Sequence, residues 1–331
     1  MLTLQCEIKI KSKSTNKIVL FDYVNSIEVK TSCKNLTDTA VVKIPRKMSW
    51  KGKEIYNYLR RDDAITIRIG YKEHGLETVF KGYIKSVENG TPIVINCENE
   101  MRLFKTITVK PEKIKNFNIK SFLKKYVPNI EVVCPNSIDF GTVVIQEQSL
   151  AQCLDKLMST FTWFKGFFRD GKFVAIIDTA SLRDNKTITF DPERNLISDT
   201  LKYELAEDVK IAIKAVSILK DNTKLECIVP SDAKDGKDYE QRQFYFPGYT
   251  DAGKLKEAAG KKLKEFVSDK MTGSITGFGV PFVQKNDVVR LKDSRRAERD
   301  GKFFWVESVD YTFNTSGYRQ KITLGYELKR G

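Results

Sequence analysis

The sequence is poor in the residues on which most catalytic and metal sites depend. Its 331 residues include one histidine, His74, and three tryptophans. His74 lies in the polar segment 71–75, which predicts a hairpin tip. A Ser-His-Asp triad or a histidine-rich zinc site would have to be assembled around that loop. We therefore expect no catalytic residue, no cofactor-binding residue and no metal ligand, and we expect that the chain is not an enzyme.

Cysteines are few and widely separated. None forms a Cys-x-x-Cys pair, and several lie within apolar strand or helix patterns, so we expect reduced core cysteines rather than a disulfide framework or a metal site. The six positions are Cys6, Cys33, Cys97, Cys134, Cys153 and Cys227.

Long apolar runs are absent as well. No stretch approaches the about 18 uninterrupted apolar residues that a membrane span requires. The first residues lack a basic segment followed by an apolar one, which is the pattern of a secretory signal. We expect a chain without a membrane span that is made and assembled in the bacterial cytoplasm.

The charge balance is strongly basic, with 57 Lys and Arg against 43 Asp and Glu, a net charge of +14. Such a balance suits nucleic acid, an anionic surface or acidic protein partners. The cations are spread along the chain, and short runs such as 9–13 and 261–264 are typical of solvated strand ends and helix faces.

The first hundred residues have the period of short strands. Apolar residues alternate within 4–10, 27–31 and 65–71. The Asn89-Gly90 pair predicts a turn between two further strands. Closely spaced strands with short turns indicate an antiparallel barrel or sandwich, with one helix predicted around Glu54 to Leu59.

From about residue 110 the pattern changes to helices. Asn118 can cap a helix that runs to Tyr126 and stops before Pro128. Ser149 begins a capping-box signature, and apolar residues then recur at helical spacing to Phe161. Two aromatic and apolar strands, 163–168 and 172–177, follow with an Asp-Gly turn between them. Residues 110–178 therefore predict a small α+β domain.

Strand patterns return after residue 200, interrupted by one helix that begins at Asp251 and carries its apolar residues on one face. The last strands predicted are 288–291, 303–306 and 320–324. They resemble the first region: the segment 63–67 followed by 80–88 matches 287–291 followed by 302–310. Tyr83 corresponds to Trp305, and Ser86 corresponds to Ser308.

A repeat of this kind predicts two copies of one β domain. We therefore predict a mainly β protein in which a small α+β domain separates two similar antiparallel β-barrels. The predicted domains are 1–108 for the first barrel, 109–180 for the α+β domain and 181–331 for the second barrel with an inserted helix.

The layout resembles the phage tail baseplate hub family, which includes late control protein D and the N-terminal part of VgrG spike proteins. The resemblance is carried by the Gly-rich segment 277–282, by 285–289, by 301–311 and by the closing 316–324. It extends to 80–84 and 95–99 in the first barrel and to the middle domain. Two departures are Asn286, where the family has Gly, and Tyr311-Thr312, where a His is common.

The resemblance implies a structural role as a baseplate hub subunit of a contractile phage tail or a phage-like injection machine. It implies a homotrimeric ring that joins the hexameric tail tube to the trimeric spike, with open strand edges paired between neighbouring subunits. Expected partners are therefore the chain itself, the tube protein, the spike protein and baseplate wedge proteins, in the baseplate of a virion or tail-like particle. No spike-like repeat follows residue 324, so we expect the spike to be a separate polypeptide.

The alternative is a single-stranded nucleic-acid-binding barrel protein. Small barrels, basic charge and aromatic side chains are the ingredients of such folds. The aromatic residues of the last hairpin could stack bases or could fill the barrel core: Phe303, Phe304, Trp305, Tyr311 and Phe313. In the hub reading, nucleic acid is expected only as passing cargo.

Overall fold

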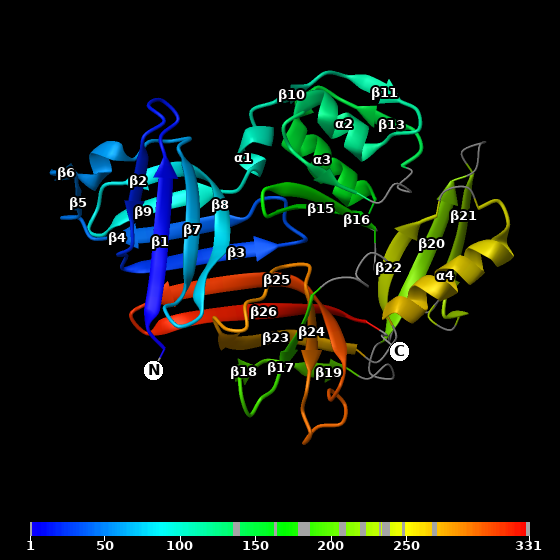
Figure 1. Ribbon diagram of the computed structural model, residues 1–331. Coiled ribbons are helices and arrows are strands. Elements are labelled where there is room, and N and C mark those ends of the chain that lie inside the picture. The colour runs from blue at the N-terminus through cyan, green and yellow to red at the C-terminus, as the bar shows by residue number, and fades with distance from the viewer. Residues whose placement is uncertain are drawn as a thin grey trace. The chain divides into compact units, whose positions relative to one another are not determined.

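The computed structural model describes residues 2–134, 140–161, 164–177, 186–204, 210–218, 223–231, 233, 239–246, 249–266 and 270–328. The chain forms two compact units, one made of Met1–Thr200 and Gly273–Gly331 and the other of Leu201–Thr272. The fold is mainly β with a small α+β part, as the sequence predicted (Figure 1). In the described part of the chain, no helix has the length and apolar character needed to cross a membrane.

One large sheet forms the frame of the first unit. Its path runs β18-β23-β26-β25-β3-β4-β9-β8-β7-β1-β2, with β17 and β24 paired at its side. Strand β19 pairs with the part of β23 that belongs to the unit Leu201–Thr272. The strands are β1 (Leu4–Lys11), β2 (Ile18–Phe21), β3 (Ser26–Ser32), β4 (Thr39–Ile44), β7 (Ala64–Tyr71), β8 (Gly75–Glu88), β9 (Ile93–Glu98), β17 (Thr187–Phe190), β18 (Leu196–Asp199), β19 (Lys202–Glu204), β23 (Lys270–Phe278), β24 (Val288–Leu291), β25 (Phe303–Asn314) and β26 (Gly317–Leu328).

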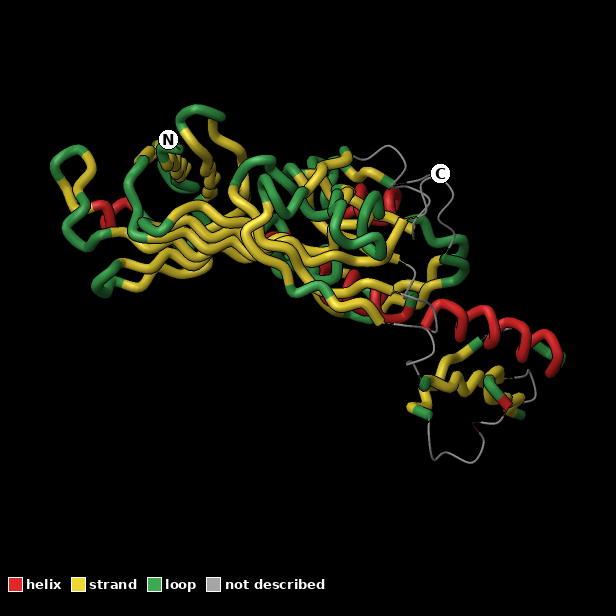
Figure 2. The backbone as a smooth tube through the Cα atoms, turned by 90° about the horizontal axis from the view of Figure 1, so that it is seen from below, coloured by secondary structure: helices red, strands yellow, loops and turns green. Residues whose placement is uncertain are grey.

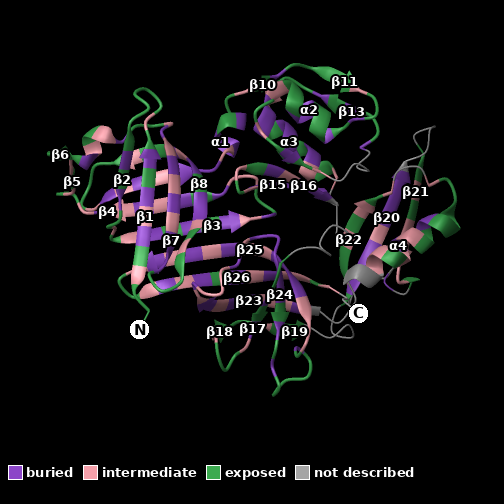
Figure 3. Ribbon diagram, viewed as in Figure 1, coloured by how far each residue is buried: buried purple, intermediate pink, exposed green. Residues whose placement is uncertain are grey.

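The predicted alternation of buried and solvent-facing side chains is present in the strands of this sheet. In β1, β3 and β7 every second side chain is buried, which gives the striped ribbons of Figure 3. Successive side chains of a strand point to opposite faces, so one face of each strand builds the core and the other meets solvent. The predicted residues of the inner face are buried: Cys6, Ile8, Ile10, Ile27, Val29, Thr31, Ile65, Ile67, Ile69 and Tyr71.

The predicted repeat has the same strand register in both copies. Ala64 of β7 lies opposite Tyr83 of β8, and Val288 of β24 lies opposite Trp305 of β25. Both β8 and β25 then have a bulge where they pair with the next strand of the sheet. In the first copy this bulge lies between Ile84 and Ser86, where β8 pairs with β9. In the second copy a bulge lies between Val306 and Ser308.

The correspondence extends over five positions of the sheet. Strands β3-β4-β9-β8-β7 form the first repeat, and β18-β23-β26-β25, with β24 beside β25, form the second. The two repeats belong to one continuous sheet, because β25 of the second pairs along its length with β3 of the first. Figure 1 shows β3 and β25 side by side, and the strands of the sheet are the yellow tubes of Figure 2. The sequence did not predict that both copies share a sheet.

The segment between the repeats is a small α+β layer. It contains α1 (Met101–Phe104), β10 (Thr108–Val109), β11 (Glu112–Ile114), α2 (Ile119–Tyr126), β12 (Val132–Val133), β13 (Val143–Ile145), β14 (Gln148–Ser149), α3 (Leu150–Thr160), β15 (Phe164–Arg169) and β16 (Lys172–Ile177). Both predicted caps are confirmed: Asn118 accepts a hydrogen bond from the Ser121 amide, and Ser149 forms a capping box with Gln152. The predicted aromatic hairpin is β15 and β16, with Trp163 outside the described residues.

The unit Leu201–Thr272 contains the predicted helix together with strands from the region after residue 200 that the sequence predicted to be extended. Besides α4 (Ala252–Phe266) it holds β20 (Ile211–Ile218), β21 (Lys224–Val229) and β22 (Glu240–Tyr245), paired in the order β21-β20-β22. Leu255 and Ala259 of α4 pack on Ile211, Ile213 and Ala215 of β20. Val267, predicted on the same helix face, lies outside the described residues.

Two local predictions differ from the structure. The helix predicted around Glu54 to Leu59 is a single 3-10 turn, Ile55–Tyr58, after the short strands β5 (Ser49–Trp50) and β6 (Lys53–Glu54). The helix α1 was not predicted, because four residues are too few to show a helical period. The predicted domain boundaries at 108 and 180 fall inside the first compact unit and stay predictions.

Candidate assembly site at the junction of the repeats

The edge at which the two repeats meet is a ladder of backbone pairs. Seven residues of β25, from Ser308 to Asn314, lie opposite β3 from Ser32 to Ser26. The Thr31 hydroxyl donates to the Val309 carbonyl at 2.9 Å, and Val309 is fully buried. On the outer face Asp310 lies opposite Lys30. Opposite charges in directly facing positions stabilise an antiparallel pair.

A turn of the same geometry precedes β7 in the first repeat and β24 in the second. Asp63 and Asp287 are both buried, and each carboxylate accepts the amide proton of the residue three positions earlier, Arg60 or Gln284. The residue before each aspartate has φ of +70°, Asp62 in one copy and Asn286 in the other. Glycine, asparagine and aspartate tolerate this left-handed conformation best. Asn286 therefore serves in the second repeat as Asp62 does in the first.

A buried ion pair ties the turn of the second repeat to the first repeat. The ammonium of Lys285 lies 2.7 and 2.6 Å from the two carboxylate oxygens of Asp38, and it also donates to the Ser32 carbonyl. Both side chains are at most 7% exposed. Asp38 also accepts hydrogen bonds from the Ser32 amide and the Asn99 side chain. Burial raises the pKa of Asp38, while Lys285 and these donors act against that rise.

A third segment closes the junction. Arg169, at the end of β15, donates to the Gln284 side chain, to the Lys285 carbonyl and to the Asp287 carboxylate, the last at 2.7 Å. All three donors belong to the guanidinium group of Arg169, and all three acceptors lie in the turn 284–287. Cys33, Phe167, Ile176 and Trp305 form an apolar cluster beside it. One arginine of the middle segment therefore fixes the turn that carries Lys285.

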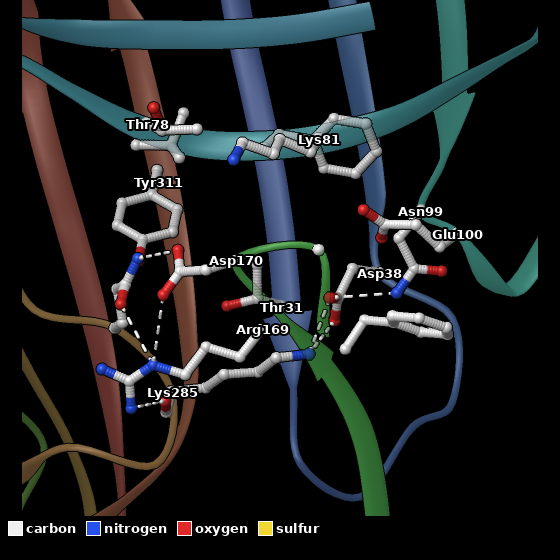
Figure 4. Close-up of a pocket in the computed structure, with 15 residues that line it drawn as sticks. Thr31, Asp38, Thr78, Lys81, Asn99, Glu100, Arg169, Asp170, Lys285 and Tyr311 are labelled. Carbon is white, nitrogen blue, oxygen red and sulfur yellow. Dashed lines mark hydrogen bonds and ion pairs between the residues drawn. The ribbon is translucent and has the colours of Figure 1, made fainter. Parts of the chain in front are cut away.

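These groups line a small cavity, shown in Figure 4. Lys81, Glu100 and Asp170 lie at its rim with Thr78, and the Lys285 and Asp38 side chains point toward each other. Its volume is about 60 Å³, far below the about 300 Å³ at which pockets for small organic ligands begin. Lys285 pairs with Asp38 and Arg169 pairs with Asp287, so the arrangement suits a structural joint rather than a reaction centre.

The aromatic residues of the last hairpin are mostly in the core. Phe304, Trp305 and Tyr311 are at most 3% exposed, and Phe313 is 7% exposed. The Trp305 ring nitrogen donates to Asn286, and the Tyr311 hydroxyl donates to the Val283 carbonyl. Base stacking needs exposed ring faces. Of the five aromatic residues considered for stacking, only Phe303 is partly exposed.

The acidic pair Asp62-Asp63 does not form two facing catalytic carboxyls. Asp62 bonds to the Arg102 guanidinium at 2.6 Å, and Asp63 accepts backbone amides of Lys13 and Arg60.

The remaining candidate residues occupy structural positions. His74 is exposed in the β7–β8 turn, as predicted. None of the six cysteines, all of them described, is in a disulfide, and burial raises the pKa of Cys6 to about 11, which disfavours the reactive thiolate. Within the described ranges, no group of His, Cys, Asp and Glu is arranged to hold a metal ion. The Gly277-Phe278-Gly279 segment ends β23 and bends toward β24.

Sequence reasoning did not find Asp38, Lys285 or Arg169. Each is a single charged residue in a polar segment, where solvent exposure is the usual outcome. The one available signal was the match between 60–63 and 284–287 across the repeat, since a turn that recurs before equivalent strands has a structural role.

No protein-family model matches the chain, and no curated protein matches it. Solved structures do. A tail protein from Neisseria meningitidis aligns over 99% of this chain and 97% of its own, with 12% identity and a TM-score of 0.67. The 43 kDa tail protein of prophage MuSo2 from Shewanella oneidensis aligns over 97% and 98%, with 13% identity and a TM-score of 0.65.

A third match is the E. coli c3393 protein, a component of the type VI secretion system with structural similarity to the phage T4 tail proteins gp27 and gp5. It aligns over 97% of this chain and 77% of its own, with 10% identity and a TM-score of 0.57. The chain therefore has the fold of phage tail proteins over nearly its whole length.

Proposed function

We propose that this chain is a structural baseplate hub subunit of a contractile phage tail or phage-like injection machine. In this proposal three copies form a ring that joins a hexameric tail tube to a trimeric spike. The observation that carries it is the internal repeat: a fold shared with tail proteins contains two copies of one strand arrangement in identical register.

The internal repeat explains how a ring of three chains can match a sixfold tube. Three chains with two repeats each present six similar units, which match a sixfold tube on one face. The parts that occur once per chain, the segment 101–177 and the unit Leu201–Thr272, supply threefold features for a spike. Wedge proteins of the baseplate are expected on the outside of this ring. The role requires no catalysis, and the junction is built of groups that bond to one another.

The positive net charge of the chain supports the proposal that its partners have acidic surfaces. The excess of 14 positive charges is spread over the surface, and Lys9, Lys11 and Lys261 are exposed. Such a surface attracts an acidic tube or spike protein, and the attraction weakens as salt screens it. Docking to the tube that does not change with salt would contradict this part of the proposal.

The test is assembly on a tail tube. Tubes formed from the tube protein of the same particle are mixed with the purified chain and imaged by electron microscopy. We expect a ring of threefold symmetry at one end of each tube. Tubes that stay bare at saturating concentration would contradict the proposal.

The nucleic-acid-binding alternative is tested on the same preparation. A single-strand binder would be a monomer that binds labelled oligonucleotides, with an affinity that falls steeply with salt. The hub proposal predicts no such monomeric complex, because four of the five candidate stacking residues are buried.

A further inference from the structure

A second pocket lies on the outer face of the first repeat. Its floor is one rung of the sheet, in which Lys11 of β1, Ala64 of β7 and Tyr83 of β8 lie opposite one another. The turn after β1 and the helix α1 form its walls. The volume is about 340 Å³, which lies within the range of binding sites for organic groups.

The equivalent rung of the second repeat is covered. Trp305 occupies the position of Tyr83 there, and it is 3% exposed. Phe167 and Ile176 of the β15–β16 hairpin belong to the same apolar cluster as this indole. In the first repeat Ala64 and Tyr83 are only partly buried. The same frame therefore carries a filled site in one repeat and an open pocket in the other.

The wall of the pocket contains an arginine that is held in place. Arg102 is 9% exposed. Its Nε donates to Asp62 at 2.6 Å, and its Nη1 lies 3.8 Å from the Glu98 carboxylate. The third nitrogen, Nη2, forms no bond to a described residue and is not fully enclosed. Because two carboxylates already fix the guanidinium, it can offer this donor to an acceptor in the pocket at little further loss of side-chain freedom.

The charge of the lining is mostly positive. Lys11 and Lys13 are exposed, and neither forms an ion pair with a residue that the structure describes. Against these two lysines and Arg102 stands one lining carboxylate, Asp62, which Arg102 already neutralises. An excess of cations around a concave site raises the local concentration of anions. The pocket is therefore suited to an anionic group.

The apolar part of the lining narrows the choice of anion. Leu103 is 38% exposed beside these charges, so an occupant with apolar carbon next to its negative charge fits best. Phosphate groups are typically held by free backbone amides. The amides around this pocket already donate within the chain: Ser12, Lys13, Asn16, Asp62, Arg102 and Leu103. The chemistry favours a carboxylate on a short hydrocarbon stem over a phosphate.

We propose that this pocket binds a carboxylate side chain from an acidic segment of a partner protein. The carboxylate accepts the free donor of Arg102, the two lysines of the rim neutralise it, and Leu103 packs against the methylene carbons of the segment. The inference gives a binding place to the acidic partner of the proposed function, and it rests on that function for the identity of the partner.

The test measures the binding of a fluorescently labelled peptide, Gly-Glu-Leu-Glu-Gly, to the full-length chain by fluorescence anisotropy at low salt. The matched probe is the same peptide with glutamine in place of both glutamates. We expect the glutamate peptide to bind about tenfold more tightly, which is the gain typical of a hydrogen bond to a charged group. Equal affinities, or no binding of either peptide, would overturn the proposal.

Lys11→Glu tests the site, and Lys9→Glu is its matched control. Both lysines are exposed on β1, and the two changes alter the net charge by the same amount. Lys9 lies opposite Thr66, one rung away from the pocket floor. We expect Lys11→Glu to weaken binding of the glutamate peptide about tenfold and Lys9→Glu less than about threefold, because an exposed charge outside the pocket is screened by solvent. Equal losses would show attraction by net charge alone and overturn the pocket.

Competition separates a carboxylate site from a phosphate site. Glutarate and inorganic phosphate are added to the bound peptide at equal ionic strength. Displacement by glutarate at the lower concentration supports the proposal. Displacement by phosphate at the lower concentration would assign the pocket to phosphate and overturn the choice of a carboxylate.

The peptide assay needs no tube, so its failure is distinct from failure of the proposed function. Rings that form on tubes while the peptide does not bind would overturn the pocket and leave the hub in place. Tubes that stay bare while the peptide binds would contradict the hub and leave the carboxylate site. If Lys11→Glu lowers the mass of the chain in solution, a second copy fills the pocket, and the assignment to a partner protein is overturned.

Discussion

The two repeats have the same frame, yet they differ in how their edges are completed. The first repeat has its β3 edge covered by β25, with Asp38 and Lys285 paired in the interior behind it. The equivalent strand of the second repeat, β18, stands at the end of the described sheet path. The two copies of the frame thus differ in what their equivalent strands pair with.

The interior of the junction shows the same difference. Lys285 occupies the position of Arg61 in the equivalent turn, but Lys285 is buried and Arg61 is exposed. The turn itself is unchanged, since its backbone bonds and positive φ recur. A single turn geometry therefore serves a buried joint in one repeat and a surface in the other.

The largest expected effect is that of breaking the buried ion pair. Lys285→Ala leaves the Asp38 carboxylate buried without its cation, and removing one partner of a buried pair typically costs about 3–5 kcal/mol of unfolding free energy. Urea unfolding followed by fluorescence measures the loss.

The control for this variant is Lys85→Ala in the first repeat. Lys85 bridges Glu98 at 2.9 Å but is 56% exposed, so its loss should cost under about 1 kcal/mol. Similar losses for both lysines would contradict the distinction between a buried joint and a surface pair.

A smaller loss is expected from Gly82→Ala. The added Cβ would lie 2.2 Å from the Glu98 carbonyl oxygen and 2.8 Å from the Asn99 Cα, which are backbone atoms. Overpacking of this kind costs about 1–3 kcal/mol. The second repeat has Phe304 at the corresponding position, so this variant probes a position at which the two repeats carry different residues. Thermal unfolding measures the cost, and an unchanged midpoint would contradict it.

Gly260→Ala is the matched control. Its Cβ would meet no atom within 4 Å, and the residue lies within α4. Alanine is favoured over glycine inside a helix by up to about 1 kcal/mol, so this variant should be slightly more stable than the parent.

The smallest effect is expected from Glu100→Gln at the rim of the cavity. Burial raises the pKa of Glu100, with Asp38 adding to the rise. A raised folded-state pKa means that ionisation costs stability, and the cost grows as pH rises from the unfolded pKa through the folded one. Glutamine removes that cost. The variant should be more stable than the parent at neutral pH, and the gain should vanish below about pH 4.

Stability of both proteins measured at pH 4 and pH 7 checks this prediction. A gain that is equal at both values would show that the pKa of Glu100 is not the cause.

Much of the frame could be predicted from the sequence because its signals are local. Alternation over Ile65, Ile67 and Ile69 indicates a strand with one buried face. Asn118 and Ser149 each indicate the start of a helix, because a capping residue bonds to an amide in the first turn of the helix. The repeat was visible because paired strands keep similar residues at similar spacing. Even the register of Tyr83 and Trp305 agrees with the alignment of the two segments.

The joint could not be predicted, because its parts are distant in sequence. Asp38 and Lys285 are separated by 247 positions, and neither has a local pattern that distinguishes it from a surface charge. Arg169 reaches the same turn from the middle segment. Pairing of β3 with β25 depends on which edges are left after each repeat folds, and no local period encodes that choice.

The most direct test of the account is the mass of the purified chain in solution by light scattering. We expect a mass near three times 38.0 kDa that persists on dilution. A mass of one chain at every concentration would contradict the ring.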